Sequence, residues 1–441
     1  THGRNDGESV GSGRSRRYGF AFNPGRRVLY FLASGSRTDG CWKSGRSHRR
    51  VCAMAHIPQG TRHLNAELNR TLVGVTGGAA RLQTPALVVD LVRFKNNLET
   101  MSTHCQKVGV ALRPHTKTHK CAAIAKLQIE AGARGICCAK LGEAEAMQAA
   151  GIQDILITSP IVTPSSIDRL LHLNESGANI VVVVDNPENG KALNDAAQKF
   201  STPLKVLLDL DPGLHRTGIE PGPNALQLAR QLFDSACLDF AGLQMYAGNL
   251  MHIAPFDDRR EQSLAAMEML ANFRNELQHA GIACLITSGG GTGTFDIDPE
   301  TGVLDELQAG SYAFMDRQYN EIETRQGDHA AFFTSLFVQT TVVSANHDNL
   351  VTTDAGLKAF ATDDKSPELY EGGPQDGRYF FFGDEHGGVR WRTSETLTVG
   401  DWMRAVTPHC DPTFNLYDVV HVIEGDTLVD IWPIDARGRS A

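Results

Sequence analysis

The sequence predicts an α/β protein that consists of an eight-stranded (β/α)8 barrel of the TIM type, followed by an all-β domain. Three observations lead to this prediction. Short β-branched runs alternate with helix-patterned segments over residues 110–313, eight such runs occur there, and the alternation stops after residue 325. Strict alternation of strands and helices is typical of a parallel sheet. Eight strands favour a closed barrel over an open sheet.

The predicted barrel strands are short apolar runs, as expected for parallel strands that are covered on both faces. They are Val110–Pro114, Gly135–Ala139, Asp154–Thr158, Asn179–Val184, Leu204–Asp209, Phe240–Met245, Cys284–Ser288 and Glu306–Ala313. Apolar residues spaced by three and four predict helices between them. These are Cys121–Ala131, Gly142–Ala150, Pro187–Lys199, Pro223–Asp234 and Asp257–His279. The last connection, residues 289–305, is short and rich in glycine, so at most a short helical turn is expected there.

Residues beyond the barrel have β character with turn residues between the runs and no long amphipathic stretch. The expected strands are Phe332–Ser344, Arg378–Phe382, Thr396–Val399 and Tyr417–Ile423. We therefore predict a barrel over residues 84–325 and a β domain over residues 326–441. The isolated run at residues 84–91 is expected to join the β domain.

The composition is that of a globular protein, with 41% hydrophobic and 21% charged residues among 441. No run approaches the roughly 18 apolar residues of a membrane helix, and we expect no membrane partner. Outside residues 1–53 the chain carries 31 basic against 48 acidic residues, so no broad nucleic-acid surface is expected. Nine cysteines without a CxxC pair are typical of buried thiols in a reducing compartment.

The N-terminal segment differs from the rest of the chain. Residues 1–53 hold eleven Arg or Lys against three acids and are rich in Gly and Ser. This composition resembles a transit peptide. A translated upstream region that ends before Met54 and a disordered tail are the alternatives. We treat residues 1–60 as an extension outside the fold, and expect a cytoplasmic protein, or an organellar one if the segment is a transit peptide.

Barrel enzymes carry their reactive groups at the carboxyl ends of the strands. The first barrel strand ends in RPHTKTHK, residues 113–120. Alternation along an extended strand puts His115 and Lys117 on one side, with Lys117 at the tip. Desolvation there is expected to lower the pKa of the lysine and make its neutral amine available for a Schiff base. The alternative is that Lys117 and Lys120 are solvated surface charges.

Later strand ends add further candidates. The segment DLDPGLHRTG presents Arg216, and LQMYAGNLMH presents Tyr246 with His252 beyond it. A histidine in such a loop is a candidate proton relay or a structural donor. The segment SGGGTGT, residues 288–294, exposes consecutive backbone N–H groups that can bind phosphate, although a triple glycine can equally be a flexible turn. Barrels commonly bind phosphate at these late loops. The candidate phosphate residues are Gly289, Gly290, Gly291, Thr292, Ser311 and Tyr312.

In the β domain, TPHCDP at residues 407–412 places His409 and Asp411 two residues apart. If the segment is extended, the imidazole and the carboxylate share a face. Two protein ligands with open water positions suit a labile divalent ion such as Mn²⁺ or Mg²⁺ better than a closed Zn²⁺ site. Taken alone, a His-x-Asp pair usually binds nothing.

These motifs together resemble the D-threonine aldolase group of fold-type III pyridoxal-phosphate (PLP) enzymes. That group includes D-3-hydroxyaspartate aldolases and, more distantly, D-serine dehydratases. The resemblance covers residues 80–438 and is carried, in order, by RPHTKTHKC, GARGICCAK, FAGLQMYAG, SGGGTG, ELQAGSYAFMD, TDAGLKA, DEHG, TPHCDPTFNLYD and DARG. It implies an alanine-racemase-like barrel with a β domain, and a homodimer.

The resemblance also implies roles for individual residues. Lys117 resembles the Schiff-base lysine, Arg216 the arginine that faces the pyridine nitrogen, and Tyr246 a tyrosine near the cofactor. The glycine segment and the Ser311–Tyr312 pair resemble the phosphate cradle. His409 and Asp411 match the divalent-metal pair, where dehydratases tend to have His-x-Cys with zinc. Ala139 departs from the family, because many relatives have glutamine at this position.

The function that follows is a carbon–carbon lyase that cleaves small D-β-hydroxy-α-amino acids, such as D-threonine, to glycine and an aldehyde. The catalytic residues would be Lys117, His252, His409 and Asp411, with His115 beside the cofactor. Two alternatives stay open. One is a dehydratase acting on D-serine or 3-hydroxyaspartate, which would release ammonia. The other is a non-catalytic PLP-binding homeostasis protein, although such proteins lack the long β domain.

Overall fold

The structure is a computed structural model that describes residues 64–325, 327 and 331–441. The predicted extension over residues 1–60 lies outside the described residues. Most of the remaining chain forms one compact unit with two sheets, one of eight and one of nine strands. In the described part of the chain, no helix is both long and apolar enough to span a membrane.

The eight-stranded sheet is the predicted barrel. Its neighbours along the order β2-β9-β8-β7-β6-β5-β4-β3 are all parallel. Hydrogen bonds from Arg134 N–H to the Leu112 carbonyl and from Cys137 N–H to the Pro114 carbonyl, both 2.9 Å, join β3 to β2 and close the sheet. The strands are β2 (Ala111–Leu112), β3 (Ile136–Cys138), β4 (Asp154–Ile157), β5 (Asn179–Val184), β6 (Leu204–Leu210), β7 (Leu238–Met245), β8 (Ile286–Gly289) and β9 (Glu306–Leu307). The predicted barrel is confirmed.

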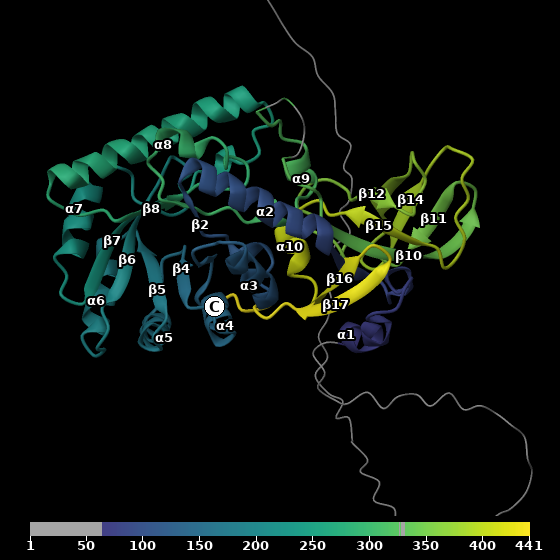
Figure 1. The fold of residues 1–441 in the computed structure, drawn as a ribbon, viewed down its shortest axis with the longest axis horizontal. Coiled ribbons are helices and arrows are strands. Elements are labelled where there is room, and N and C mark those ends of the chain that lie inside the picture. Colours follow the sequence, from purple (N-terminus) through teal and green to yellow (C-terminus); the bar gives the residue numbers. More distant parts are fainter. Residues whose placement is uncertain (1–63, 326, 328–330) are drawn as a thin grey trace, which may run out of the picture. The chain divides into compact units, whose positions relative to one another are not determined.

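Helices alternate with these strands and lie along their outer side (Figure 1). Local signals fix where they begin. Thr163 and Asn186 accept hydrogen bonds from first-turn N–H groups, and each is followed by a proline in the first turn. The α-helices are α1 (Leu64–Asn69), α2 (Leu91–Val108), α3 (Ala122–Glu130), α4 (Leu141–Ala149), α5 (Pro164–Glu175), α6 (Pro187–Ala197), α7 (Pro223–Phe233), α8 (Phe256–His279), α9 (Arg317–Asn320) and α10 (Cys410–Phe414).

Single 3-10 turns fill several of the connections. Between β8 and β9 the only helical element is one such turn, as the short glycine-rich connection predicts. These turns are η1 (Arg70–Leu72), η2 (Ala79–Arg81), η3 (Thr116–Thr118), η4 (Gly248–Leu250), η5 (Asp298–Thr301) and η6 (Ser311–Ala313).

The barrel interior is filled by small and branched side chains. A cluster separate from the main core is formed by Cys137, Leu156, Val181, Val183, Leu207, Ala241 and Ile286. These residues come from successive strands β3 to β8, and on β5 they are two positions apart, as inward-facing residues of a strand must be. The barrel is therefore packed, and a ligand has room only at its ends.

The second sheet forms the β domain. Strand β1 lies in this sheet, antiparallel to β10 and parallel to β16, and α2 then leads into the barrel. Asp90 caps α2, and Gly109, at φ 73°, ends it. The strands are β1 (Ala86–Asp90), β10 (Leu336–His347), β11 (Leu350–Thr353), β12 (Glu368–Glu371), β13 (Arg378–Phe381), β14 (Gly387–Arg390), β15 (Trp402–Val406), β16 (Val419–Glu424) and β17 (Thr427–Pro433).

One expected strand of the β domain is wrong. Residues 396–399 form no strand, because Asp401 accepts hydrogen bonds from the backbone N–H of Thr398 (2.6 Å) and from its hydroxyl (3.1 Å), which makes a turn. The segment after His409 is not extended, so the condition for a face shared by alternation is not met. His409 has extended backbone angles, but helix α10 begins at the next residue, so Asp411 lies in a first helical turn.

Candidate active site

A pocket of about 600 Å³ lies at the carboxyl ends of the barrel strands. Residues that follow every one of the eight strands contribute to its wall, as the barrel rule requires. Seven of the residues predicted from the sequence line it: His115, Lys117, Arg216, Tyr246, Gly291, Thr292 and Ser311. These residues are up to 196 positions apart in the chain, and the closed barrel brings them together.

Lys117 reaches this wall from a 3-10 turn, and not from a strand tip as predicted. His115 caps the turn, and its Nδ1 accepts the Lys117 backbone N–H at 3.3 Å. The other ring nitrogen, Nε2, lies 3.0 Å from the Thr158 hydroxyl and donates to it. Thr116 points away, into the protein, where its hydroxyl donates to the Cys137 carbonyl at 2.9 Å. Burial, reinforced by the Lys117 ammonium, holds the pKa of His115 well below its usual value, so the ring is neutral.

The Lys117 ammonium forms an ion pair with Asp411, which the β domain supplies. This contact overturns the predicted pKa of the lysine. Burial alone would lower the pKa of Lys117, but the Asp411 carboxylate outweighs burial and raises it. In turn, burial would raise the pKa of Asp411, and the Lys117 ammonium holds it below its usual range. The two residues are therefore a charged pair.

Arg216 and Tyr246 line the pocket beside each other. The guanidinium carbon lies 5.2 Å from the centroid of the tyrosine ring, a distance at which a cation is attracted to the ring face. The loop before Arg216 is shaped by Asp211, whose Oδ1 accepts the backbone N–H groups of Gly213 at 2.9 Å and His215 at 3.0 Å. Burial raises the pKa of Tyr246, so its hydroxyl stays protonated.

The structure divides the predicted phosphate segments. Gly291, Thr292 and Ser311 line the pocket, and Gly289 and Gly290 do not. A Cβ at position 289 would lie 2.3 Å from the Met245 carbonyl oxygen, and one at position 290 would lie 2.5 Å from Asp298 Oδ2. Gly290 also has a φ of 70°. The first two glycines are therefore required by close backbone packing behind the pocket.

The Tyr312 side chain is also placed differently from the prediction. It is fully buried, and its hydroxyl accepts a hydrogen bond from Gln128 at 3.2 Å, outside the pocket. Its backbone N–H donates to the Thr292 hydroxyl at 3.0 Å. Tyr312 thus joins the two segments that were predicted to hold a phosphate, and it offers no side-chain donor to the pocket.

His409 and Asp411 lie at the start of α10. Besides Lys117, Asp411 has the Ser311 hydroxyl and the Cys410 thiol at 3.4 Å from its Oδ1. The His409 Nδ1 lies 2.7 Å from Asp363 Oδ2, and among the residues that the structure describes Nε2 has no hydrogen-bond partner. Within the described residues, no group of three or more His, Cys, Asp or Glu is arranged to hold a metal ion. A site here would therefore use two protein ligands and water.

His252 is exposed and does not line the pocket. Its ring lies 4.6 Å, centroid to centroid, from the ring of Tyr319, which does line the pocket. Although the residue is exposed, partial desolvation of its ring by neighbouring groups, followed by the charge of His409, lowers the pKa of His252. The ring is therefore close to the pocket wall without reaching it.

A chain of buried polar groups forms part of the pocket wall, and the sequence analysis missed it. Gln308 Nε2 donates to Gln244 Oε1 at 3.1 Å, and Gln244 Nε2 donates to Asp209 Oδ1 at 2.9 Å. Burial raises the pKa of Asp209 to about 6. Thr217 donates to the same carboxylate at 2.9 Å. The signal that could have revealed Asp209, Gln244 and Gln308 is a polar side chain at the carboxyl end of an apolar strand.

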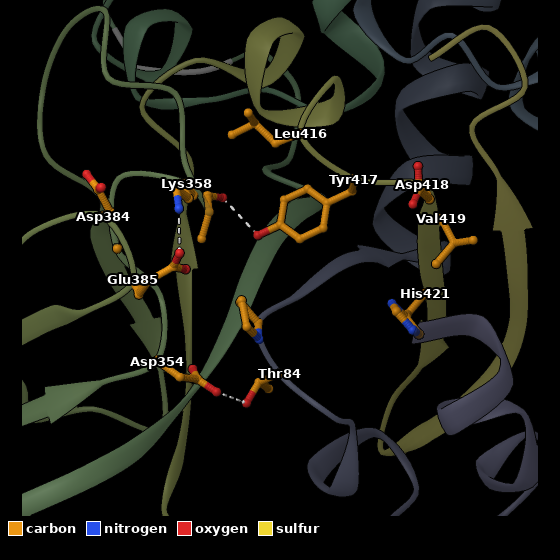
Figure 2. A pocket seen from close by; sticks show the side chains of 13 residues that line it. Thr84, Asp354, Lys358, Asp384, Glu385, Leu416, Tyr417, Asp418, Val419 and His421 are labelled. Carbon is orange, nitrogen blue, oxygen red and sulfur yellow. Dashed lines mark hydrogen bonds and ion pairs between the residues drawn. The ribbon is translucent and has the colours of Figure 1, made fainter. Parts of the chain in front are cut away.

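A second pocket, of about 310 Å³, lies in the β domain and does not include Lys117 or the glycine segments. Figure 2 shows that several of its polar side chains contact other groups of the pocket. The Lys358 ammonium pairs with Glu385 at 2.6 Å, Thr84 donates to Asp354 at 2.5 Å, and the Tyr417 hydroxyl donates to the Ala359 carbonyl at 2.8 Å. Its lysine is already paired with Glu385, and its lining does not include Lys117, Arg216 or the glycine segments of the first pocket.

Comparisons with known proteins show which family this chain resembles over most of its length. The chain matches the alanine racemase N-terminal domain over residues 89–318 and a putative serine dehydratase domain over residues 335–423. It is 41% identical to a D-threonine aldolase of Arthrobacter sp over 362 residues, which is 82% of this chain and 94% of that protein. It is 36% identical to a 3-hydroxy-D-aspartate aldolase of Paracoccus denitrificans (strain Pd 1222) over 364 residues, 82% and 93% of the two chains. The solved structure of a D-threonine aldolase from Filomicrobium marinum superposes with a TM-score of 0.79 at 35% identity, covering 82% of this chain and 97% of that one.

Proposed function

Since the chain belongs to the D-threonine aldolase family of alanine-racemase-like enzymes, we propose that it is a PLP-dependent lyase that cleaves D-β-hydroxy-α-amino acids to glycine and an aldehyde with the help of a divalent metal ion. One observation carries the proposal. The amine of Lys117, which lines the 600 Å³ pocket, meets the carboxylate of Asp411 from the β domain. A cofactor aldehyde and a metal ion would thus be held next to each other.

The pocket residues fit PLP. Lys117 offers a primary amine for the aldehyde, and Arg216 offers a cation for the ring. Gly291 and Gly310 leave the backbone bare along the wall, beside the hydroxyls of Thr292 and Ser311. At Gly310 a Cβ would lie 2.6 Å from Thr118 Oγ1, so only glycine keeps this close approach. Bare backbone N–H groups with neighbouring hydroxyls are the donors that a phosphate requires.

The residues at the start of α10 fit a divalent ion. His409 Nε2 and the oxygens of Asp411 would bind it, and water would complete the shell. A mixed set of one nitrogen and hard oxygen ligands suits Mn²⁺ or Mg²⁺ better than a closed Zn²⁺ site. When bound, PLP supplies an electron sink for the α-carbon and the metal a Lewis acid for the β-hydroxyl.

The chain's own residues would hold the reacting groups and move protons. Lys117 donates a hydrogen bond to Asp411 Oδ2, so a proton that leaves the lysine Nζ has an acceptor in contact. His115, held neutral, fixes the turn that carries Lys117. The Arg216 cation beside the ring would keep a pyridine nitrogen unprotonated, which weakens the electron sink and increases the need for help at the β-hydroxyl. His252 remains our candidate for a proton relay, through the Tyr319 side of the pocket.

The reaction separates this proposal from its two rivals. PLP-loaded protein is incubated with D-threonine, D-phenylserine and D-3-hydroxyaspartate, with and without a chelator, and glycine, aldehyde and ammonia are measured. We expect equal amounts of glycine and aldehyde, loss of both with chelator, and recovery with Mn²⁺. Ammonia and a keto acid would identify a dehydratase. No turnover, with borohydride still leaving a pyridoxyl group on Lys117, would identify a non-catalytic PLP carrier.

The Asp411→Ala variant tests the metal role within the same assay. We expect aldehyde release to fall at least about 100-fold, as for loss of a group that acts in the transition state, while the absorbance of bound PLP persists. The control is Asp384→Ala, which removes an exposed acid of the β domain and should leave aldehyde release unchanged. Wild-type rates in Asp411→Ala would refute the metal role.

A further inference from the structure

We propose that Asp363 is a positioning residue for His409, whose imidazole it holds through Nδ1 so that Nε2 is the nitrogen that binds the metal ion. This inference rests on the proposed function, because it concerns the metal site at the start of α10. Asp363 lies in the loop between β11 and β12, 46 residues before His409, and no sequence motif links the two.

The contact is a direct hydrogen bond of 2.7 Å between His409 Nδ1 and Asp363 Oδ2. The Asp363 side chain is 47% exposed and that of His409 24% exposed. The Asp363 carboxylate is therefore partly open to solvent while it contacts the His409 ring. A carboxylate oxygen accepts hydrogen bonds only, so Nδ1 is the donor in this contact, and Nε2 is the ring nitrogen left to bind a metal ion.

The backbone of His409 is fixed independently of Asp363. The residue's carbonyl accepts the Thr413 hydroxyl at 2.7 Å. The next backbone N–H, of Cys410, donates to the buried carboxylate of Asp316 at 2.8 Å. What these bonds leave free is rotation of the imidazole about its side-chain torsions. The Asp363 contact removes that freedom and fixes the tautomer at the same time.

Carboxylates that accept the second ring nitrogen of a metal-binding histidine typically improve metal affinity by about 10-fold to 100-fold. They do so because the ring is already oriented and the ligating nitrogen is more basic. Asp363 contacts Nδ1 of His409 directly, so it can have this effect on metal binding at Nε2. A site with only two protein ligands depends on it more than a site with four, because each ligand carries a larger share of the binding.

The adjacent Asp364 is a matched control. It carries the same charge in the same loop, and its influence in this region is through its charge on His252. It makes no hydrogen bond to His409 among the described residues. Removing Asp364 thus removes a negative charge near the metal site without removing the contact that we propose to matter.

The experiment measures Mn²⁺ binding to the PLP-loaded protein by the electron paramagnetic resonance of free Mn²⁺. Asp363→Ala should weaken binding about 10-fold to 100-fold. Asp363→Asn keeps an acceptor oxygen, so it should weaken binding less. Asp364→Asn should stay within about threefold of wild type, because exposed charges are screened by salt. At saturating Mn²⁺ we expect the kcat of Asp363→Ala to return to near the wild-type value. The substitution should change only the Mn²⁺ concentration that gives half-maximal activity.

The possible results distinguish an error in the proposed metal site from an error in the proposed role of Asp363. If wild type and His409→Ala bind Mn²⁺ equally, the proposed metal site itself is wrong. If His409→Ala loses binding and Asp363→Ala binds like wild type, the metal site stands and this inference is overturned. It is also overturned if Asp364→Asn weakens binding as much as Asp363→Ala, since charge alone would then explain the result. Circular dichroism and the PLP absorbance establish that each variant is folded and loaded.

Discussion

At the scale of single residues, the charge of a neighbour decides the state of Lys117. A lysine at a barrel mouth is expected to be partly desolvated and to have a lowered pKa. The structure gives it Asp411 as a partner, and the pKa is raised instead. The two effects have opposite signs, and a carboxylate in contact outweighs the burial of a side chain that is 40% exposed. The Lys117 amine therefore stays protonated as long as it is in contact with the Asp411 carboxylate.

At Asp298, by contrast, burial decides the protonation state of the carboxyl, because no cation opposes it. It lies behind the glycine segment and accepts hydrogen bonds from the hydroxyls of Ser263 and Thr294. Burial raises its pKa from 3.8 to about 7. The folded protein thus binds this proton more tightly than the unfolded chain does. The stability from this group is complete below about pH 4 and is lost as the pH rises to about 7.

Asp298→Asn should remove this loss, because asparagine is neutral at every pH. We expect the free energy of unfolding to fall less steeply between pH 5 and 7.5 in the variant, with a difference on the order of 2 kcal/mol. Urea unfolding at several pH values measures it. Glu268→Gln, an exposed position on α8, should parallel wild type. Parallel curves for Asp298→Asn would contradict the assignment.

At the scale of elements, a buried ion-pair network helps to fix the strands where the barrel closes. Arg113, directly after β2, donates to Glu306 at the start of β9 through Nε (2.7 Å) and Nη2 (2.9 Å), and to Asp154 at the start of β4 through Nη1 (2.6 Å). The side chains of Arg113 and Glu306 are 2% and 1% exposed. One guanidinium thus connects three strands of the barrel.

Arg113→Ala should destabilise the protein by about 3–5 kcal/mol, because it leaves the buried Glu306 carboxylate largely uncompensated. Arg134 contacts the same carboxylate at 3.2 Å but is 48% exposed. Arg134→Ala should therefore cost less than about 1 kcal/mol. Denaturant unfolding of both variants tests the contrast. Equal losses would indicate that the network acts through exposed charge and not through burial.

The short helix α10 changes how His409 and Asp411 are placed relative to each other. In an extended segment, His409 and Asp411 would share a face by alternation. Instead, His409 precedes the helix and Asp411 lies in its first turn. A carboxylate is favoured in a first helical turn, where backbone N–H groups are unpaired. At this helix start Asp411 contacts Lys117, and His409 contacts Asp363.

At the scale of the whole molecule, the candidate site joins the barrel to the β domain. Lys117 and the glycine segments belong to the barrel, and His409 and Asp411 to the β domain. Strand β1 lies in the β domain's sheet although it precedes the barrel in sequence. A ligand that binds His409 and Asp411 only in the folded state should therefore stabilise the entire unit.

Chelation should lower the melting temperature of the PLP-loaded protein. A metal ion at 100 times its dissociation constant contributes about 2.7 kcal/mol, which for a chain of this size corresponds to roughly 3 °C. Differential scanning calorimetry with and without chelator measures the shift. His409→Ala should melt at one temperature under both conditions. A shift of the same size in that variant would place the stabilising metal elsewhere.

The sequence by itself determined the barrel, because β-branched runs, amphipathic spacing and helix caps are local and act within a few residues. It also indicated which residues line the pocket, since the carboxyl ends of parallel strands must meet. Only the tertiary structure decided that Lys117 pairs with Asp411, that Asp363 holds His409, and that Gly289 and Gly290 support the pocket from behind. These contacts join residues that are distant in the chain or on separate elements. No local pattern encodes them, because the packing of the two sheets creates them.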